Sequence, residues 1–482
     1  MTHTPHSNAG MSRFSSVLLV IGILLIAANL RAPFTGVAPV LEQIIAHFNL
    51  TASQAGFITT LPLIAFAVIS PMAASLAKHQ GLERTLFFAV FLILLGIAGR
   101  VFNSSIMLFV GTAIIGAGIS GLMSALELAE QGCSVDIFDQ QQAGQAASWA
   151  GGGILSPMYP WRYAPEVNQL AQYGKSLYQM WNEKLLPITG IDFQIHNTGM
   201  LIFDQEDFDV GLNYANQSQE PMQQCDLLNR KQLEQINPHI SEKFQQAIHF
   251  PQLSNVRNPR LLQSLISYLK QHPFVRFFEH CSIDQLIVKN KTVHGIQTSN
   301  GQVFHADHVV LTSGAWSQYW EEHINRQIPV HPIQGQMLLF KTSENWLPTM
   351  CMNRVMYLIP RQDGHIVCGS SMADCGFSTA VDEQTQQDIL SACLDMVPEL
   401  KQFPIVSRWA GLRPSSPQGI PYIGEMPDIA NLWANFGHFR NGLCMGAGSA
   451  QLLRQLILKQ VPIVDPSPYS PSRLKKKNLV PQ

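Results

Sequence analysis

The sequence predicts an α/β protein that is preceded by about three transmembrane helices. Two patterns lead to this prediction. Residues 1–104 contain three long apolar runs with very few charges, whereas the chain from Ala113 onward alternates short apolar segments with amphipathic ones. The formal net charge of -2 gives no indication of a nucleic-acid partner. The average composition therefore describes neither part of the chain.

The apolar runs are Ser16–Phe34, Ala55–Ala77 and Thr85–Val101, and each has roughly the 20 residues that a helix needs to cross a bilayer. A signal peptide is the alternative for the first run. That run is long, ends with Asn29 and Arg31, and is followed by two similar runs, which favours an inserted helix.

Basic residues in the loops predict the orientation of these helices. Arg13 precedes the first run, and Lys78 and Arg84 lie between the second and the third, whereas residues 35–53 contain no Lys or Arg. The positive-inside rule then places the N-terminus in the cytoplasm. Three crossings would leave the end of the third helix outside, on the wrong side for a cytoplasmic enzyme domain.

Two stretches in this part carry a resemblance. NLRAPFTGVAPVLEQI and the basic loop AKHQGLERTL resemble the first helices of a cyanate-transporter-like branch of the major facilitator superfamily. Such transporters need about twelve helices around a central site, and three cannot form a transport path. Arg31 is either part of an anion pathway or a snorkelling residue at a helix end. We interpret residues 1–108 as a truncated transporter-like segment that an apparent gene fusion joined to the rest.

The segment that follows allows two interpretations. Ala113–Ile115 is a short apolar strand, and Gly116, Gly118 and Gly121 form the motif G-x-G-x-x-G of a phosphate-binding turn. The same glycines could instead pack a fourth transmembrane helix against its neighbours.

Asp139 favours the first interpretation. Leu122–Gln131 predicts an amphipathic helix, and Ser134–Phe138 predicts a second strand that ends just before Asp139. A dinucleotide-binding fold places a carboxylate about 20 residues after its glycines to receive the ribose hydroxyls, while the helix N-terminus faces the pyrophosphate. We therefore expect a dinucleotide site here.

Later segments predict a second domain. Ala147–Leu155 is too glycine-rich for a helix interior and suits backbone lying flat against a large ligand, with a plain flexible loop as the alternative. His308–Gly314 predicts a strand and turn at which the nucleotide-binding domain resumes. Thr198–Phe203 and Gln336–Phe340 predict strands of a second, antiparallel sheet. The nucleotide-binding domain is thus discontinuous, with the second domain inserted twice.

The cysteines predict reduced thiols. All eight lie beyond Gly132 and none forms a C-x-x-C pair, which indicates neither a disulfide framework nor a zinc site. We expect no metal ion. The enzyme domain is expected to function in the cytoplasm, and the chain to associate with the inner membrane if residues 1–108 insert.

Three further stretches carry a second resemblance: Met356–Arg361 (MYLIPR), Trp409–Pro414 (WAGLRP) and Gly437–Gly442 (GHFRNG). Over about residues 112–470 the chain resembles the D-amino-acid oxidase superfamily, and within it the glycine oxidases of thiamine synthesis. The resemblance implies a discontinuous Rossmann-like domain that binds FAD noncovalently, and a substrate domain with an antiparallel sheet.

The resemblance also implies the reaction, an FAD-dependent oxidative deamination of glycine or a similar small amine. Hydride leaves Cα for flavin N5, molecular oxygen is reduced to hydrogen peroxide, and the imine is hydrolysed to glyoxylate and ammonia. No general base is required if the substrate enters as the neutral amine. A quinone-linked D-amino-acid dehydrogenase and a non-catalytic membrane fusion fragment are the alternatives, and the sequence leaves open whether a homo-oligomer forms.

Three residues are implied to act on the substrate: Arg413 clamps its carboxylate, Tyr357 lies over the same group, and Arg440 borders substrate and flavin. The chemistry agrees for Arg413, because a guanidinium matches a planar carboxylate with two parallel bonds. A structural ion pair is the alternative for Arg413, and an interdomain carboxylate for Arg440. Arg361 and Asp363 are expected in a hairpin with no chemical role.

The expected cofactor contacts come from the glycine motif, the carboxylate after it, the glycine-rich stretch, an adenine-side strand and the turn after GHF. These residues are Gly116, Gly118, Ile119, Ser120, Gly121, Asp139, Gln140, Ala147, Ser148, Gly152, Gly153, Ile154, Ile283, His438, Phe439, Arg440, Asn441, Gly442, Leu443 and Cys444. The predicted bounds are 1–108 for the membrane segment, 109–185, 255–330 and 405–470 for the FAD-binding domain, 186–254 and 331–404 for the substrate domain, and 471–482 for a tail.

Overall fold

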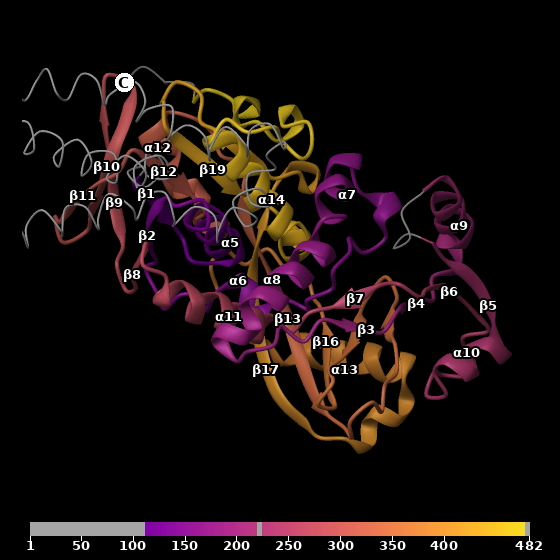
Figure 1. Cartoon of the computed structure of the whole chain (residues 1–482). Coiled ribbons are helices and arrows are strands. Elements are labelled where there is room, and N and C mark those ends of the chain that lie inside the picture. The colour runs from indigo at the N-terminus through magenta and orange to yellow at the C-terminus, as the bar shows by residue number, and fades with distance from the viewer. Residues whose placement is uncertain (1–110, 219–223, 478–482) are drawn as a thin grey trace, which may run out of the picture. The chain divides into compact units, whose positions relative to one another are not determined.

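The computed structural model describes residues 111–218 and 224–477 (Figure 1). The predicted membrane runs, their orientation and the transporter resemblance fall outside the described residues. Within the described ranges, no helix is both long enough and apolar enough to cross a membrane.

The first sheet has six strands in the order β18, β19, β12, β1, β2, β8. All neighbours are parallel except β18 and β19, which are antiparallel. The bounds are β1 Gly111–Ile115, β2 Ser134–Phe138, β8 Val275–Phe278, β12 His308–Leu311, β18 Tyr422–Glu425 and β19 Leu432–Phe436. The parallel strands end at one edge, where an open α/β sheet binds its ligands.

Both faces of this sheet are covered, as the apolar sequences of its strands require. Ile114 and Val135 belong to a core formed with five helices, whereas Ile115 and Val309 belong to a core on the other face. The helices are α5 Ile119–Ala129, α7 Pro165–Ala171, α8 Gly174–Thr189, α11 Asn258–Gln271 and α14 Gly442–Ile457. The second core is closed by the short helix α12 Glu321–Ile324 and a three-stranded sheet of β9 Ile283–Lys289, β10 Thr292–Thr298 and β11 Val303–His305.

The second large sheet has eight strands in the order β17, β13, β16, β15, β14, β4, β6, β5. The bounds are β4 Met200–Ile202, β5 Asp226–Asn229, β6 Gln246–Phe250, β13 His331–Lys341, β14 Met350–Met352, β15 Tyr357–Pro360, β16 His365–Gly369 and β17 Ile405–Ser415. Helices α9 Phe208–Gln217, α10 Arg230–Ile236 and α13 Glu383–Met396 pack beside it, and β3 His196–Asn197 pairs with β7 Ser254–Asn255. In Figure 1, α13 lies beside β13 and β16.

Several expectations differ from the structure. The second sheet is not wholly antiparallel, because β14 and β4 are parallel. No hairpin joins these two strands, so no tight turn dictates their direction. The helix expected at 122–131 is α5, which begins three residues earlier at Ile119. The glycine-rich stretch is not all loop, since it opens with the single-turn helix α6 Ala147–Ala150. Strand β17, inside the predicted bounds 405–470 of the FAD-binding domain, is an edge strand of the eight-stranded sheet.

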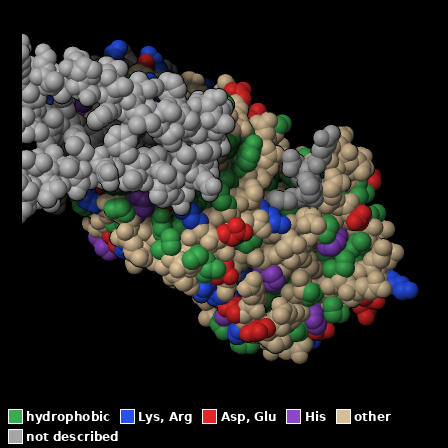
Figure 2. Space-filling view, viewed as in Figure 1, with side chains coloured by type: hydrophobic (Ala, Val, Ile, Leu, Met, Phe, Trp, Pro, Cys, Tyr) green, Lys and Arg blue, Asp and Glu red, His purple; other side chains and the backbone are tan. Residues whose placement is uncertain are grey.

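Figure 2 shows acidic and basic side chains interspersed on the visible described face. This mixture fits the small net charge of the chain. A large surface of one sign, which a nucleic-acid partner would require, is not seen on this face.

Candidate cofactor and substrate site

A cavity of about 450 Å³ lies at the edge where the parallel strands end. Its lining comes from both large sheets, from the turn between β1 and α5, and from the glycine-rich stretch that follows β2. One end is therefore built on the six-stranded sheet, and the other on β13, β15 and β17 of the eight-stranded sheet.

The turn between β1 and α5 is tight because its glycines leave no room for side chains. Gly116 has φ +114°, and a Cβ there would lie 2.5 Å from the carbonyl oxygen of Thr312. A Cβ at Gly121 would overlap the carbonyl oxygen of Gly116. Gly118 lines the cavity, and the hydroxyl of Ser148 accepts a 2.9 Å hydrogen bond from the Ile119 N–H at the start of α5. The helix N-terminus thus faces the cavity, where it favours negative charge.

Asp139 holds this turn from the end of β2. One carboxylate oxygen accepts a hydrogen bond from the Ala117 N–H and the other from the Gln141 N–H, both at 2.8 Å. Burial raises the pKa of Asp139, and these two N–H groups oppose the rise. Each oxygen keeps a second lone pair, so the carboxylate can still receive hydroxyl groups from the cavity side.

The glycine-rich stretch is fixed by two side chains that lie behind it. Asn258 donates hydrogen bonds to the carbonyl oxygens of Ser148 and Gly151 at 3.0 and 2.7 Å. Arg361 donates to the carbonyl oxygen of Gly152 at 2.8 Å. A Cβ at Gly153, which has φ +81°, would overlap Asn258. The backbone of this stretch is therefore held flat along the cavity wall.

Arg361 is buried and also donates to Asn255 and to the carbonyl oxygen of Val256. Burial lowers its pKa to about 10. It lies at the hairpin position expected from the sequence, but it supports the cavity wall, a role that the sequence did not suggest.

A buried histidine closes the far end of the cofactor side. His438 pairs with Ser449 at 3.0 Å and faces Ser120 at 3.5 Å, and burial lowers its pKa to about 4. The ring is therefore neutral near pH 7. The amide nitrogen of Asn441 and the amide oxygen of Asn435 are buried without a hydrogen-bond partner in the described chain, and both residues line the cavity.

Arg413 dominates the substrate end. Its guanidinium lies over Gly335 of the neighbouring strand β13, where any Cβ would overlap it. It donates to the carbonyl oxygen of Ser371 at 3.2 Å and to the Ser370 hydroxyl at 2.5 Å. Burial lowers its pKa, and the nearby Arg440 acts in the same direction. Among the described residues, no acidic side chain forms an ion pair with Arg413, so a bound anion can balance its charge.

Tyr357 and Arg440 lie beside Arg413. The Tyr357 side chain is buried, and its hydroxyl donates to the sulfur of Met337 at 3.6 Å. Arg440 is exposed at the cavity mouth, and its contact in the described chain is the sulfur of Met158 at 4.0 Å. The alternative interpretations gave Arg413 and Arg440 carboxylate partners. Among the described residues, neither arginine pairs with a carboxylate.

The cavity brings together all the site residues expected from the sequence except two. Gly121 serves the close approach of α5 to the glycine turn. Cys444 is buried in α14, where its thiol donates to the carbonyl oxygen of Asn441 and burial raises its pKa to about 12. The lining also includes residues that sequence reasoning missed: Gly335, Met337, Ser370, Gly411 and residues 312–316, 319 and 320.

No group of three metal-ligating side chains is found in the described part of the chain, and all eight cysteines are free thiols. The donors around the cavity are instead backbone N–H groups, amides and arginines. Such a set suits anionic and hydrogen-bonding organic ligands.

Comparisons with known proteins agree with this geometry. The family model for FAD dependent oxidoreductases (DAO) matches residues 112–456. A glycine oxidase from Pseudomonas putida is 40% identical over 358 residues, which cover 74% of this chain and 97% of that protein. A bifunctional protein ThiO/ThiG from Trichormus variabilis is 28% identical over 354 residues, covering 72% of this chain and 52% of that protein.

Among solved structures, glycine oxidase from Geobacillus kaustophilus superposes with a TM-score of 0.70 at 24% identity. The match covers 75% of this chain and 98% of that one. At this identity the likeness shows the fold, which is the α/β fold with sheets that the family uses to bind FAD.

Proposed function

The chain belongs to the DAO family of FAD-dependent oxidoreductases, and on that premise we propose that it oxidises glycine or a similarly small amino acid in thiamine thiazole synthesis. The observation that carries the proposal is Arg413, a half-buried guanidinium over Gly335 that faces the cavity without an ion-pair partner among the described residues. A planar carboxylate is the ligand that such a group binds best.

The described residues fit FAD. The glycine turn gives backbone access to a pyrophosphate at the N-terminus of α5, and Asp139 has lone pairs for ribose hydroxyls. The unpaired amide oxygen of Asn435 and amide nitrogen of Asn441 match a ring system that carries both donors and acceptors. We assign the cofactor-binding role to the expected residues that line the cavity, and a packing role to Gly121 and Cys444.

FAD held by these residues would supply the oxidation of the amine, with molecular oxygen as the final electron acceptor. The protein orients the substrate. Arg413 fixes the carboxylate with two parallel donors, Tyr357 covers it, and Arg440 supplies positive charge at the mouth. The neutral His438 adds no positive charge to the cofactor side of the cavity. Orientation and electrostatics account for the protein's share of the catalysis, with no side chain required as a base.

A quinone-linked dehydrogenase is the second candidate, because the long apolar runs of residues 1–104 favour an inner-membrane protein. Membrane attachment, the fusion of a transporter-like segment and action of the enzyme domain in the cytoplasm stay proposals that rest on the sequence.

The experiment is to purify the full chain and measure flavin content and peroxide release under air with glycine, sarcosine and D-amino acids. Peroxide formed with glycine supports the oxidase. Turnover that requires a quinone analogue would replace it with the dehydrogenase, and a flavin-free chain would refute both. Rescue of a thiamine-requiring strain that lacks its glycine oxidase tests the link to thiamine.

A further inference from the structure

A second cavity of about 230 Å³ adjoins the substrate end of the first. Met158, Tyr357, Ser370 and Arg440 line both cavities. We call the second cavity the vestibule. Its lining consists of Met158, Tyr159, Arg162, Tyr163, Met352, Asn353, Arg354, Val355, Met356, Tyr357, Ser370 and Arg440. Two chain segments, 158–163 and 352–357, supply nearly all of this lining and form its two walls.

The vestibule presents positive charge. Arg162, Arg354 and Arg440 line it, and its lining contains no Asp or Glu. The acidic partners of the first two arginines lie behind the walls, since Arg162 pairs with Asp207 and Arg354 with Glu206. A ligand that carries a carboxylate would therefore meet cations in the vestibule, next to the cavity that contains Arg413.

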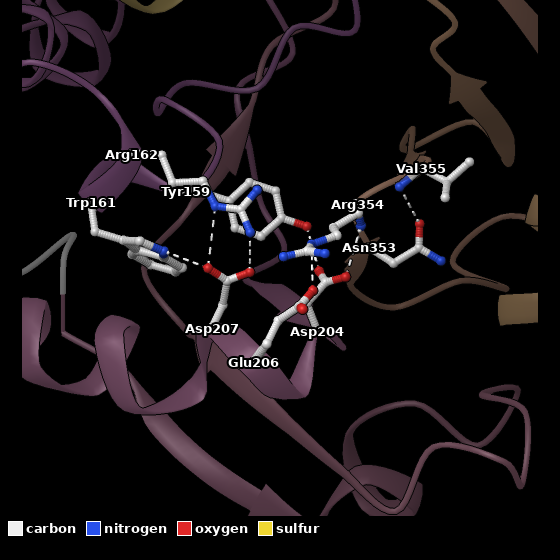
Figure 3. Close-up of polar contacts among 9 residues, drawn as sticks. All are labelled: Tyr159, Trp161, Arg162, Asp204, Glu206, Asp207, Asn353, Arg354 and Val355. Atoms are coloured by element: carbon white, nitrogen blue, oxygen red, sulfur yellow. Dashed lines mark hydrogen bonds and ion pairs between the residues drawn. The ribbon is translucent and has the colours of Figure 1, made fainter.

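Asp204 joins the two walls. One of its carboxylate oxygens accepts a 2.5 Å hydrogen bond from the Tyr159 hydroxyl on the first wall. The other accepts a 2.9 Å hydrogen bond from the Arg354 backbone N–H on the second wall. Figure 3 shows Asp204 between these two groups. Since hydrogen bonds to an ionised carboxylate are stronger than those between neutral groups, this link resists separation of the walls.

Hydrogen bonds within each wall also fix its conformation, so Asp204 joins two ordered segments. On the first wall, Asp207 accepts a 2.9 Å hydrogen bond from the Trp161 indole and also binds Arg162 (Figure 3). On the second wall, the side-chain oxygen of Asn353 accepts from the N–H groups of Val355 and Met356 at 3.0 and 2.8 Å.

We propose that Asp204 is a positioning residue that sets the width of the vestibule by joining Tyr159 to Arg354, and so limits the size of the amine that reaches Arg413 and Tyr357. The inference rests on the proposed function. It adds that selection for small substrates depends on a carboxylate that does not itself line either cavity.

The test compares Tyr159→Phe and Asp204→Ala with the parent full-length, flavin-loaded chain, using peroxide release with glycine and with D-valine. Tyr159→Phe removes the hydroxyl and keeps the ring. The lost hydrogen bond affects substrate binding only indirectly, so only part of its free energy should appear in KM. We therefore expect KM for glycine to rise roughly three- to tenfold with kcat within about twofold. The ratio of kcat/KM for D-valine to that for glycine should rise roughly fivefold or more, since a wider vestibule admits the larger side chain.

The double variant should have the same KM for glycine and the same selectivity as Asp204→Ala alone, because both changes remove the same link. Glu206→Gln is the matched control. It removes an exposed ion pair with Arg354 but leaves Asp204 and Tyr159 in contact, so the ratio of kcat/KM for D-valine to that for glycine should not change.

Unchanged KM and selectivity in Tyr159→Phe would overturn the inference, as would a lower melting temperature without a change in selectivity. If Asp204→Ala loses its flavin, Tyr159→Phe decides alone. A parent chain that releases no peroxide with any amine refutes the proposed function instead, so the two failures are distinguishable.

Discussion

Backbone atoms form the wall at one end of the main cavity, and side chains form it at the other. At the six-stranded sheet the wall is mostly backbone, shaped by Gly116, Gly121 and the glycine-rich stretch and braced from behind by Asn258 and Arg361. At the eight-stranded sheet the wall consists of side chains from different strands. Arg413 of β17 lies over Gly335 of β13, next to Tyr357 of β15.

This difference separates two kinds of failure. A change at Gly116, Gly121 or Gly153 of the backbone-built end should release the cofactor, because the atom that a new side chain would meet first is a backbone carbonyl oxygen. A change at the end built from side chains should leave the cofactor bound and weaken substrate binding.

The largest effect is expected for Gly121→Ala. The new methyl group would overlap the carbonyl oxygen of Gly116, and backbone can yield only if α5 moves away from β1. We expect a loss of about 1–3 kcal/mol or more in stability and a purified chain without flavin absorbance. Gly111→Ala is the control, because its methyl group would meet nothing closer than 3.7 Å. A flavin-loaded Gly121→Ala chain would contradict the account of this turn.

Arg413→Ala comes next, and it should abolish most activity while flavin stays bound. Loss of a buried partner of a carboxylate costs roughly 2–5 kcal/mol, which lowers kcat/KM by about thirtyfold to several thousandfold. Arg413→Lys should recover little, because a point charge cannot replace the two parallel donors. Arg408→Ala, an exposed position on the same strand, should behave like the parent. Near-normal glycine turnover in Arg413→Ala would make Arg440 the next candidate.

Gly335→Ala and Gly411→Ala form a matched pair, since these glycines lie opposite each other in the register of β13 and β17 but their new methyl groups would contact different ends of the cavity. The methyl group at 335 would displace the end of Arg413, whereas the one at 411 would lie 2.5 Å from Cβ of Ala150 in α6. We expect Gly335→Ala to raise KM roughly tenfold with flavin retained. Gly411→Ala should instead raise the dissociation constant of FAD. Equal effects of both changes on flavin binding would contradict the assignment of cofactor and substrate to different ends of the cavity.

The smallest effect is expected from deleting residues 1–108. The family match begins at residue 112, and the described core of the enzyme domain begins with β1 at Gly111. We expect a flavin-loaded oxidase whose kcat/KM for glycine equals that of the full chain. If the truncated chain binds no flavin while the full chain does, the N-terminal part is integral to the fold.

The backbone-built end could be predicted well from the sequence because its signals are local. The glycines, Asp139 and the strand at 134–138 follow one another within a few dozen residues, and their spacing determines the turn. Arg413 and Tyr357 came from a family resemblance.

The sequence could not predict the roles of Gly335, Asn258 and Arg361, because these roles depend on strand register and on which segments meet. Gly335 has meaning only once β13 and β17 are paired. The parallel pairing of β14 with β4 and the Asp204 link between the vestibule walls were missed for the same reason.

The most direct test of the central claim is to mix the purified chain with glycine without oxygen and record the flavin spectrum, then admit air. Because Arg413 is expected to hold the carboxylate while Cα is oxidised, the account predicts that glycine bleaches the flavin absorbance and that air restores it with release of peroxide. The same sample of Arg413→Ala should bleach far more slowly. A flavin that stays oxidised with saturating glycine in the parent chain would contradict the account.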